Sequence, residues 1–232
     1  MADTLTLIQL RTRVRERADM VGSTFVSDTE LNGYINSSYQ ELYDKLVEAV
    51  QDYNITQFDF TIASGNTQAV PAAFYKVRGI DDLSSVPSKT VRKFNFNERN
   101  DYAYPPVTVS PSSEFSDVTY RLIGNNLLFL PAELAPRSYK LWYVPVPTAL
   151  SGDSDTADGI QGWNEYVVVD AAIKCLIKEE SDVGELLRAK KGLNDRIDNM
   201  KHDRDQSQPE KVARVRNKKY YGRLGYVPDH GL

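Results

Sequence analysis

The chain has very little of several features on which common protein functions depend. Its 232 residues include one cysteine, Cys175, and two histidines, and no apolar run approaches the length of a membrane-spanning helix. A single cysteine excludes an internal disulfide framework and a cysteine-built zinc site, and it favours a reducing compartment. The N-terminal segment is charged and lacks the apolar core and the small-residue cleavage site of a signal peptide. We therefore expect a protein with no membrane segment, made and used in a cytoplasm or carried in a particle assembled there.

Catalytic and cofactor-binding signatures are missing as well. The sequence contains no G-x-S-x-G elbow, no G-x-G-x-x-G fingerprint and no G-x-x-x-x-G-K-[ST] phosphate loop. Cys175 falls in an apolar helical segment, where a cysteine is usually an inert core residue. Neither His202 nor His230 has a nucleophile or a metal-ligand partner nearby in the sequence. We expect no enzyme activity and no cofactor.

Two acidic stretches are weak candidates for a metal or catalytic site. Residues 153–159 begin like a calcium loop, but the sixth position is Asp158 instead of glycine and the twelfth is Asn164 instead of glutamate. An acidic loop before a helix explains them better, because a helix N-terminus favours negative charge. The carboxylates between residues 179 and 182 are local in sequence, unlike catalytic carboxylate pairs. We expect no metal site, and a solvated corner at residues 179–182.

Helical periodicity marks the N-terminal part of the chain. Residues 4–21 and residues 27–53 each repeat apolar side chains at spacings of three and four, which predicts two amphipathic helices packed antiparallel across a short loop. A start of the first helix at Thr4 is as good as one at Thr6. The capping-box pairs are Thr6 with Gln9 and Ser27 with Glu30. The apolar positions of the first helix are Leu7, Leu10, Val14, Ala18 and Val21.

The same periodicity returns near the C-terminus. Residues 166–177 are apolar on almost every side, interrupted mainly by Asp170 and Lys174, which is typical of a central helix. A further capping-box pair, Asp182 with Glu185, opens a last helix that fades near residue 205.

Between the helical segments the apolar period changes to two, which indicates strands. The predicted strands are 55–62, 67–70, 75–83, a hairpin over 118–130 that turns at Gly124, and 139–144. Residues 84–116 are polar and rich in proline, and we interpret them as a loop with one helical turn near residues 97–100. A structureless stretch of this length is unusual in a compact domain. Either it hides a further element or it is a functional surface loop.

These assignments predict an α+β protein: mainly a helical bundle, built from N-terminal and C-terminal helix pairs, with an inserted small antiparallel β-region and an extended C-terminal tail. The expected divisions are residues 1–54 for the N-terminal helical pair, 55–148 for the β-region, 149–208 for the helical pair that completes the bundle, and 209–232 for the tail.

The tail has a different composition from the rest of the chain. Residues 209–232 hold six basic and two acidic residues, a net charge of +4, whereas the preceding 208 residues hold 22 basic and 30 acidic residues, a net charge of −8. The tail has tyrosines but no long apolar period, so alone it cannot bury enough surface to offset its ordering entropy. The candidate binding residues are Lys211, Arg214, Arg216, Lys218, Lys219, Tyr220, Tyr221, Arg223 and Tyr226.

Three interpretations of the tail remain open. Its cations and tyrosines could follow a phosphate backbone and stack on bases. The same residues could anchor in an acidic groove of a protein partner, where tyrosine and arginine are common hot spots. The tail could also be disordered without a binding role. We favour a protein partner, because the acidic body and the isoelectric point of about 5.3 oppose binding to nucleic acid.

Four segments, taken in order, resemble the head-to-tail adaptor (connector) proteins of tailed bacteriophages. They are LIQLRTRVRERADM…FVSDTELNGYINSSYQELYDKLVEAV, QFDFTIASGNTQAVPAAFYKVRGID, YRLIGNNLLFLPAELAPRSYKLWYVPVPTAL and GWNEYVVVDAAIKCLIKEESD. The resemblance covers roughly residues 4–205, and the order of the segments carries it more than any one of them.

The resemblance implies a structural virion protein. Members form rings, typically twelve-fold, beneath the capsid portal, where they join the portal to tail proteins of a nozzle or tail tube and line the channel used in DNA ejection. It implies neighbouring copies, portal and tail proteins as partners, and passing DNA without sequence specificity. The C-terminal segment of such adaptors docks on the portal, which here would be Lys211–Tyr226. The expected location is the head-tail junction of the virion, after assembly in the host cytoplasm. An acidic ring lumen would suit this role, because like charge disfavours adhesion of DNA.

Overall fold

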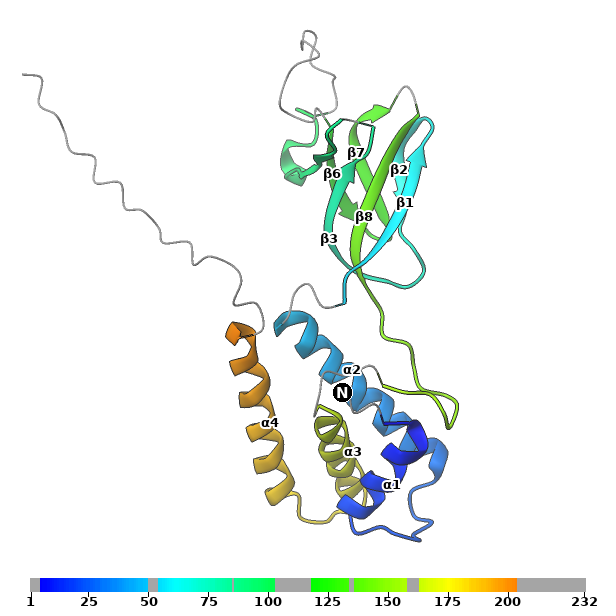
Figure 1. The fold of residues 1–232 in the computed structure, drawn as a ribbon, viewed down its shortest axis with the longest axis vertical. Coiled ribbons are helices and arrows are strands. Elements are labelled where there is room, and N and C mark those ends of the chain that lie inside the picture. The colour runs from blue at the N-terminus through cyan, green and yellow to red at the C-terminus, as the bar shows by residue number, and fades with distance from the viewer. Residues whose placement is uncertain are drawn as a thin grey trace, which may run out of the picture.

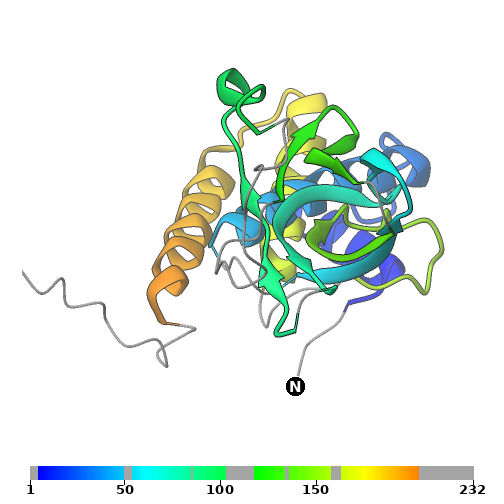
Figure 2. The same cartoon turned by 90° about the horizontal axis from the view of Figure 1, so that it is seen from above.

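Two parts lie one above the other along the long axis of the molecule, a helical bundle and a β-sandwich (Figure 1). The structure is a computed structural model that describes residues 5–49, 54–84, 86–102, 118–133, 136–157 and 163–203. Within these ranges the helical bundle consists of α1–α4 and the β-sandwich of β1–β8. Viewed along the long axis, the β-sandwich lies over the bundle, and α4 extends to one side of it (Figure 2).

The helices begin close to their predicted caps. Their bounds are Leu7–Arg17 for α1, Asp28–Ala49 for α2, Asn164–Lys178 for α3 and Gly184–Asp203 for α4. The predicted capping box of Thr6 and Gln9 is confirmed, since each side chain bonds the backbone N–H of the other residue. The Ser27 hydroxyl accepts a hydrogen bond from the backbone N–H of Glu30. The Asp182 carboxylate accepts from the N–H of Gly184, so α4 begins at Gly184 without the predicted bond to Glu185.

Helix α3 is the centre of the bundle, as its apolar sequence predicts. It packs against α1, α2 and α4, and ten of its fifteen residues are buried. Four predicted apolar positions of α1 are buried in the same core, but Val21 is 73% exposed because the helix ends at Arg17 and Val21 lies in the following loop. The buried positions of α1 and of the residue that follows it are Leu7, Leu10, Val14 and Ala18.

The β-sandwich contains two four-stranded sheets. The strand order is β1-β8-β3-β4 in the first sheet and β2-β7-β6-β5 in the second. The strand bounds are Thr56–Ile62, Gly65–Ala69, Phe74–Asp82, Lys89–Thr90, Arg92–Lys93, Thr119–Ile123, Asn126–Glu133 and Arg137–Pro145 for β1 to β8. A short 3-10 helix, η1, covers Phe96–Glu98, close to the predicted helical turn.

Aromatic rings fill the space between the two sheets. The ring centroids of Phe129 and Tyr139 are 4.7 Å apart, and those of Phe60 and Tyr139 are 5.6 Å apart. Tyr120 packs against Phe129 at 6.5 Å. These residues come from strands of both sheets. Their rings therefore join the two layers, and such pairs contribute about 0.5–1.5 kcal/mol each beyond the area that they bury.

At both pairs of sheet edges the chain crosses from one sheet to the other. Each of these crossings joins an edge strand of the first sheet to an edge strand of the second. Strands β1 and β2 are edge strands of different sheets, joined by a turn in which Gly65 has a φ of +96° that favours glycine. Strands β4 and β5 are the opposite edges, joined through the buried Val91. A strand edge that continues into the facing sheet is less exposed to pairing with another chain.

The prediction of a mainly helical bundle with a small antiparallel β-region is wrong. The β-part consists of two sheets of four strands each, and one of its pairs, β5 with β6, is parallel. Alternation in a sequence reveals a strand but not the sheet to which the strand belongs. Strands β4 and β5 have two residues each, which is too short to show any alternation, and they lie in the stretch predicted to be a loop.

Candidate functional site

The joint between the two parts is formed by the second half of α2 and the end of β8. Tyr43, Val47 and Val144 form a small buried cluster there. The Tyr43 hydroxyl donates to the carbonyl oxygen of Pro145 at 2.6 Å. The Tyr75 hydroxyl of β3 donates to the Asp44 carboxylate of α2 at 2.9 Å, which raises the pKa of Tyr75. These few contacts between the parts contrast with the large core inside each of them.

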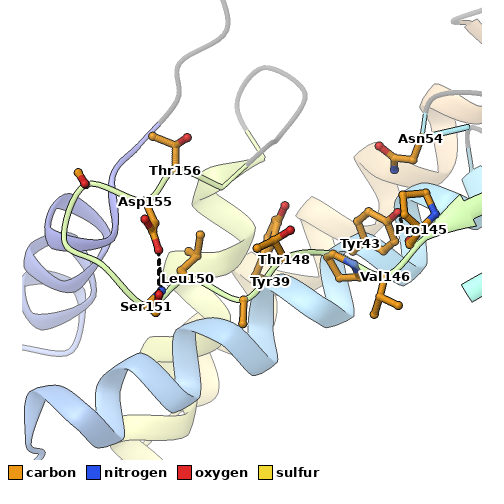
Figure 3. Close-up of a pocket in the computed structure, with 13 residues that line it drawn as sticks. Tyr39, Tyr43, Asn54, Pro145, Val146, Thr148, Leu150, Ser151, Asp155 and Thr156 are labelled. Carbon is orange, nitrogen blue, oxygen red and sulfur yellow. Dashed lines mark hydrogen bonds between the residues drawn. The ribbon is translucent and has the colours of Figure 1, made fainter. Parts of the chain in front are cut away.

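A return linker, residues 146–157, runs back from the β-sandwich along α2 (Figure 3). The Asn36 side chain of α2 holds it by donating to the carbonyl oxygen of Leu150 at 2.9 Å and accepting from its N–H at 2.7 Å. Farther along, the N–H of Leu7 donates to the carbonyl oxygen of Asp155 at 2.8 Å. The linker is therefore fixed to α2 and to the start of α1.

An open groove of about 630 Å³ lies between α2 and the return linker. Tyr39 and Tyr43 of α2 line one side, and Pro145 of β8 lines the other together with linker residues between Val146 and Thr156 (Figure 3). Its one described carboxylate, Asp155, accepts from the backbone N–H groups of Gly152 and Ser151, both at 2.8 Å. These bonds lower the pKa of Asp155 and occupy the carboxylate. The described residues that line the groove include no converging acid, base and nucleophile, and we interpret the groove as part of the joint.

A network of charges crosses the interior of the bundle. Asp170 of α3 is 2% exposed and forms ion pairs with Lys174, at 2.8 Å, and with Lys190 of α4. Glu41 of α2 pairs with the same two lysines, at 2.9 Å and 3.4 Å. Lys174 also donates to the Ser38 hydroxyl at 3.1 Å. The network links three helices and balances the charge of a carboxylate that would otherwise be costly to bury.

The network shifts the pKa values of Asp170 and Lys190. Burial acts to raise the pKa of Asp170, but hydrogen bonds from Lys174 and Lys190 outweigh it and leave the pKa below its usual value. Burial acts to lower the pKa of Lys190, but the bond and the charge of Asp170 outweigh it and raise the pKa. Burial raises the pKa of the neighbouring Tyr166 to about 12. Asp170 and Lys190 therefore stay charged near neutral pH, as members of an ion-pair network and not as proton donors or acceptors.

The other chemical candidates of the sequence are placed as follows. Cys175 is buried, and burial raises the pKa of its thiol to about 11, which makes it a poor nucleophile. Glu179, Glu180 and Asp182 are exposed at the corner between α3 and α4, as predicted. His202 lies in the last turn of α4. Over the described ranges no group of three histidine, cysteine or acidic side chains could hold a metal ion, and no helix is long and apolar enough to cross a membrane.

The predicted binding tail, residues 209–232, lies outside the described residues, as do His230 and Asp158. Two contacts that hold the structure together were not identified from the sequence. Asp170 was visible as a charge within an apolar helix, which is the signal of a buried ion pair. Asn36 gave no signal, because its partner is 114 residues away along the chain.

Charge is divided unevenly between the two parts. The described residues of the β-sandwich region, 54–145, hold nine basic and six acidic residues, a net charge of +3. Those of the helical bundle and the return linker hold 12 basic and 18 acidic residues, a net charge of −6. The acidic character of the body therefore belongs to its helices and linker, and the inserted strands have the opposite sign.

A model of the SU10 adaptor protein family matches residues 5–216 of the chain. The match takes in the bundle, the β-sandwich and the first part of the tail, including Lys211, Arg214 and Arg216. No curated protein matches the chain.

Proposed function

The chain belongs to the SU10 adaptor protein family, of phage head-to-tail adaptors, and we propose that it joins the capsid portal to the tail as a ring of identical subunits. It is a phage structural protein and a virion component. The family match over nearly the whole chain carries the proposal. The ring has twelve copies, encloses the channel through which DNA leaves the head, and carries no enzyme activity.

Each part of the chain has a role in this proposal. The helical segments, residues 1–54 and 149–208, build the ring, and their net negative charge keeps passing DNA from adhering. The inserted region, residues 55–148, projects from the ring and meets tail proteins. The tail, residues 209–232, docks on the portal through its cations and tyrosines and becomes ordered there. Many weak contacts repeated around the ring add up through multivalency.

The direct test mixes the full chain with portal from the same particle and weighs the products by native mass spectrometry, with electron microscopy of the complexes. The proposal expects a ring on the portal with the full chain and none with a chain that ends at residue 208. Two matched variants separate the contributions of the tail: glutamine at its six cationic positions with the tyrosines kept, and alanine at its three tyrosines with the cations kept. A full chain that fails to bind portal under any ionic condition contradicts the proposal.

The second candidate is a nucleic-acid-binding module that acts through the tail, which the tail's net charge of +4 favours. It expects binding of a labelled DNA duplex that weakens steeply with salt and disappears without residues 209–232. Binding of DNA without association with portal would establish this candidate in place of the adaptor.

A further inference from the structure

One edge of the β-sandwich carries an exposed aromatic ring among cations. Phe96 of η1 is 41% exposed. The guanidinium carbon of Arg99 lies 4.7 Å from its ring centroid, and that of Arg121 on β6 lies 5.6 Å from it. Lys93 of β5 is exposed three residues before Phe96, next to the paired strand β6. We refer to Lys93, Phe96, Arg99 and Arg121 as the Phe96 cluster.

Among the described residues, the cations of this cluster have no acidic partner, unlike two cations of the facing sheet. In the facing sheet Arg137 pairs with Asp82 at 3.5 Å, and Lys140 pairs with Asp59 at 3.8 Å. No carboxylate of the described residues forms an ion pair with Lys93, Arg99 or Arg121. Three uncompensated cations beside an exposed ring are the composition of a binding surface, because arginine and aromatic residues dominate interface hot spots.

The two arginines are held in place before any partner arrives. Arg99 donates from Nη1 to the carbonyl oxygen of Phe96 at 3.2 Å, and Arg121 donates from Nη1 to the carbonyl oxygen of Phe94 at 3.1 Å. Each guanidinium has five N–H donors, so most of them remain available to a ligand. A planar fork held in position matches a carboxylate or a phosphate with little loss of side-chain entropy.

The surroundings favour a carboxylate on a protein over the phosphates of DNA. Both guanidinium groups already lie against the Phe96 ring, which leaves it poorly placed to stack on a base. Glu98 and Asp101 are exposed in the same segment and would repel a phosphate backbone. A protein surface can carry charges of both signs, so it can place carboxylates against the arginines and a cation against Glu98.

We propose that the Phe96 cluster is a docking site for an acidic segment of another virion protein. The segment places carboxylates against Arg99, Arg121 and Lys93, a cation against Glu98 and an apolar side chain against the exposed part of Phe96. This inference rests on the proposed function only in taking the partner to be a virion component. It makes the basic β-sandwich a second contact surface, separate from the tail that docks on portal.

The test places a photo-crosslinking amino acid at Asn97, beside the cluster, and produces particles that carry the full-length variant. After irradiation, mass spectrometry identifies what residue 97 contacts. A crosslink to an acidic segment of a different virion protein supports the proposal. A crosslink to DNA, to a non-acidic segment or to another copy of this chain overturns it, and so does the absence of any crosslink at residue 97.

Two pairs of substitutions in the same crosslinking chain test the role of the cations. Arg99→Ala with Arg121→Ala is expected to lower the crosslink yield at least tenfold. The matched control, Arg13→Ala with Arg188→Ala, removes the same charge from exposed positions on the bundle and is expected to leave the yield unchanged. Equal losses in both pairs would overturn the proposal, since they would show a general charge effect.

A milder pair covers the case in which the alanine variant does not fold. Arg99→Lys with Arg121→Lys keeps the charge but loses the planar fork, and we expect a several-fold loss of yield with an unchanged melting temperature. An unchanged crosslink yield in this double lysine variant would show that the partner does not recognise the planar guanidinium groups, which would contradict the proposal. Absence of the chain from purified particles would refute the adaptor function itself, which distinguishes that failure from a failure of the docking site.

Discussion

The helical bundle combines an apolar core with a partly buried ion network, whereas the core of the β-sandwich combines aliphatic side chains with packed aromatic rings. In the bundle Asp170 lies among α2, α3 and α4 and is balanced by two lysines. In the β-sandwich the buried carboxylate of Asp82 lies at the end of β3, away from the rings of Phe60, Phe129 and Tyr139. The stability of the bundle therefore includes a contribution that depends on charge balance and pH, in addition to the packing and apolar area on which both parts depend.

The two parts can be observed separately, because the two tryptophans of the chain are divided between them. Trp142 lies on β8, and Trp163 lies at the start of α3. Replacing one tryptophan by phenylalanine leaves the other as the fluorescent reporter of the part in which it lies. The four predictions below use this pair of reporters, together with far-UV circular dichroism, in urea denaturation.

The largest effect is expected from Phe129→Ala. Phe129 is fully buried and contacts the rings of Phe60, Tyr120 and Tyr139, so its removal leaves a cavity between the sheets. We expect the β-sandwich to lose about 4 kcal/mol of stability. The transition reported by Trp142 should move to lower urea concentration much more than the transition reported by Trp163. Equal shifts of both reporters would show that the two parts unfold as one unit.

A somewhat smaller effect, of about 3 kcal/mol, is expected from Asp170→Asn. The substitution leaves Lys174 and Lys190 with only the half-exposed Glu41 as an acidic partner. Here the Trp163 transition should shift, and the Trp142 transition should not. The double variant Asp170→Leu with Lys190→Met removes the buried carboxylate and one of its half-buried partners and should recover much of the loss, since an apolar pair of similar size often replaces a buried ion pair. A double variant no more stable than Asp170→Asn would contradict the charge-balance explanation.

Acid should affect the two parts differently. The pKa of Asp170 is lowered in the folded chain, so the stability that it contributes is fully present above its unfolded value of about 3.9 and is lost as the pH falls through the folded value. We expect the Trp163 transition to weaken below about pH 4. In Asp170→Asn this part of the acid dependence should be missing. If Asp170→Asn keeps the full acid dependence of the original chain, that dependence comes from other groups in the bundle and not from Asp170.

The smallest effect concerns the joint. Tyr43→Phe keeps the ring in the cluster with Val47 and Val144 but removes the hydrogen bond to Pro145. We expect a loss of about 1 kcal/mol, the usual contribution of one hydrogen bond. Because the bond joins the two parts, the variant should also separate the two reporter transitions further than in the original chain. Tyr34→Phe, whose hydroxyl bonds Glu30 within the same helix, is the control and should leave the separation of the transitions unchanged.

Local signals in the sequence determined much about this protein. The period of the apolar residues predicted the four helices, and the spacing of Thr6 and Gln9 predicted the first cap. The alternation of Tyr139, Leu141 and Tyr143 predicted the buried face of β8. The order of these segments carried the resemblance to the adaptor family, which the family match confirms. All of these signals arise between residues that are near one another along the chain.

Tertiary structure decided the rest, because those features depend on residues far apart in sequence. The division of the strands into two sheets is set by pairings such as β1 with β8 and β2 with β7. The contact of Asn36 with Leu150 and the pairing of Asp170 with Lys190 exist only once the helices and the return linker have packed. The Phe96 cluster likewise requires β6 to bring Arg121 beside a ring that is 25 residues earlier in the chain. Sequence periodicity reports which face of an element is apolar, but only packing decides which faces and charges meet.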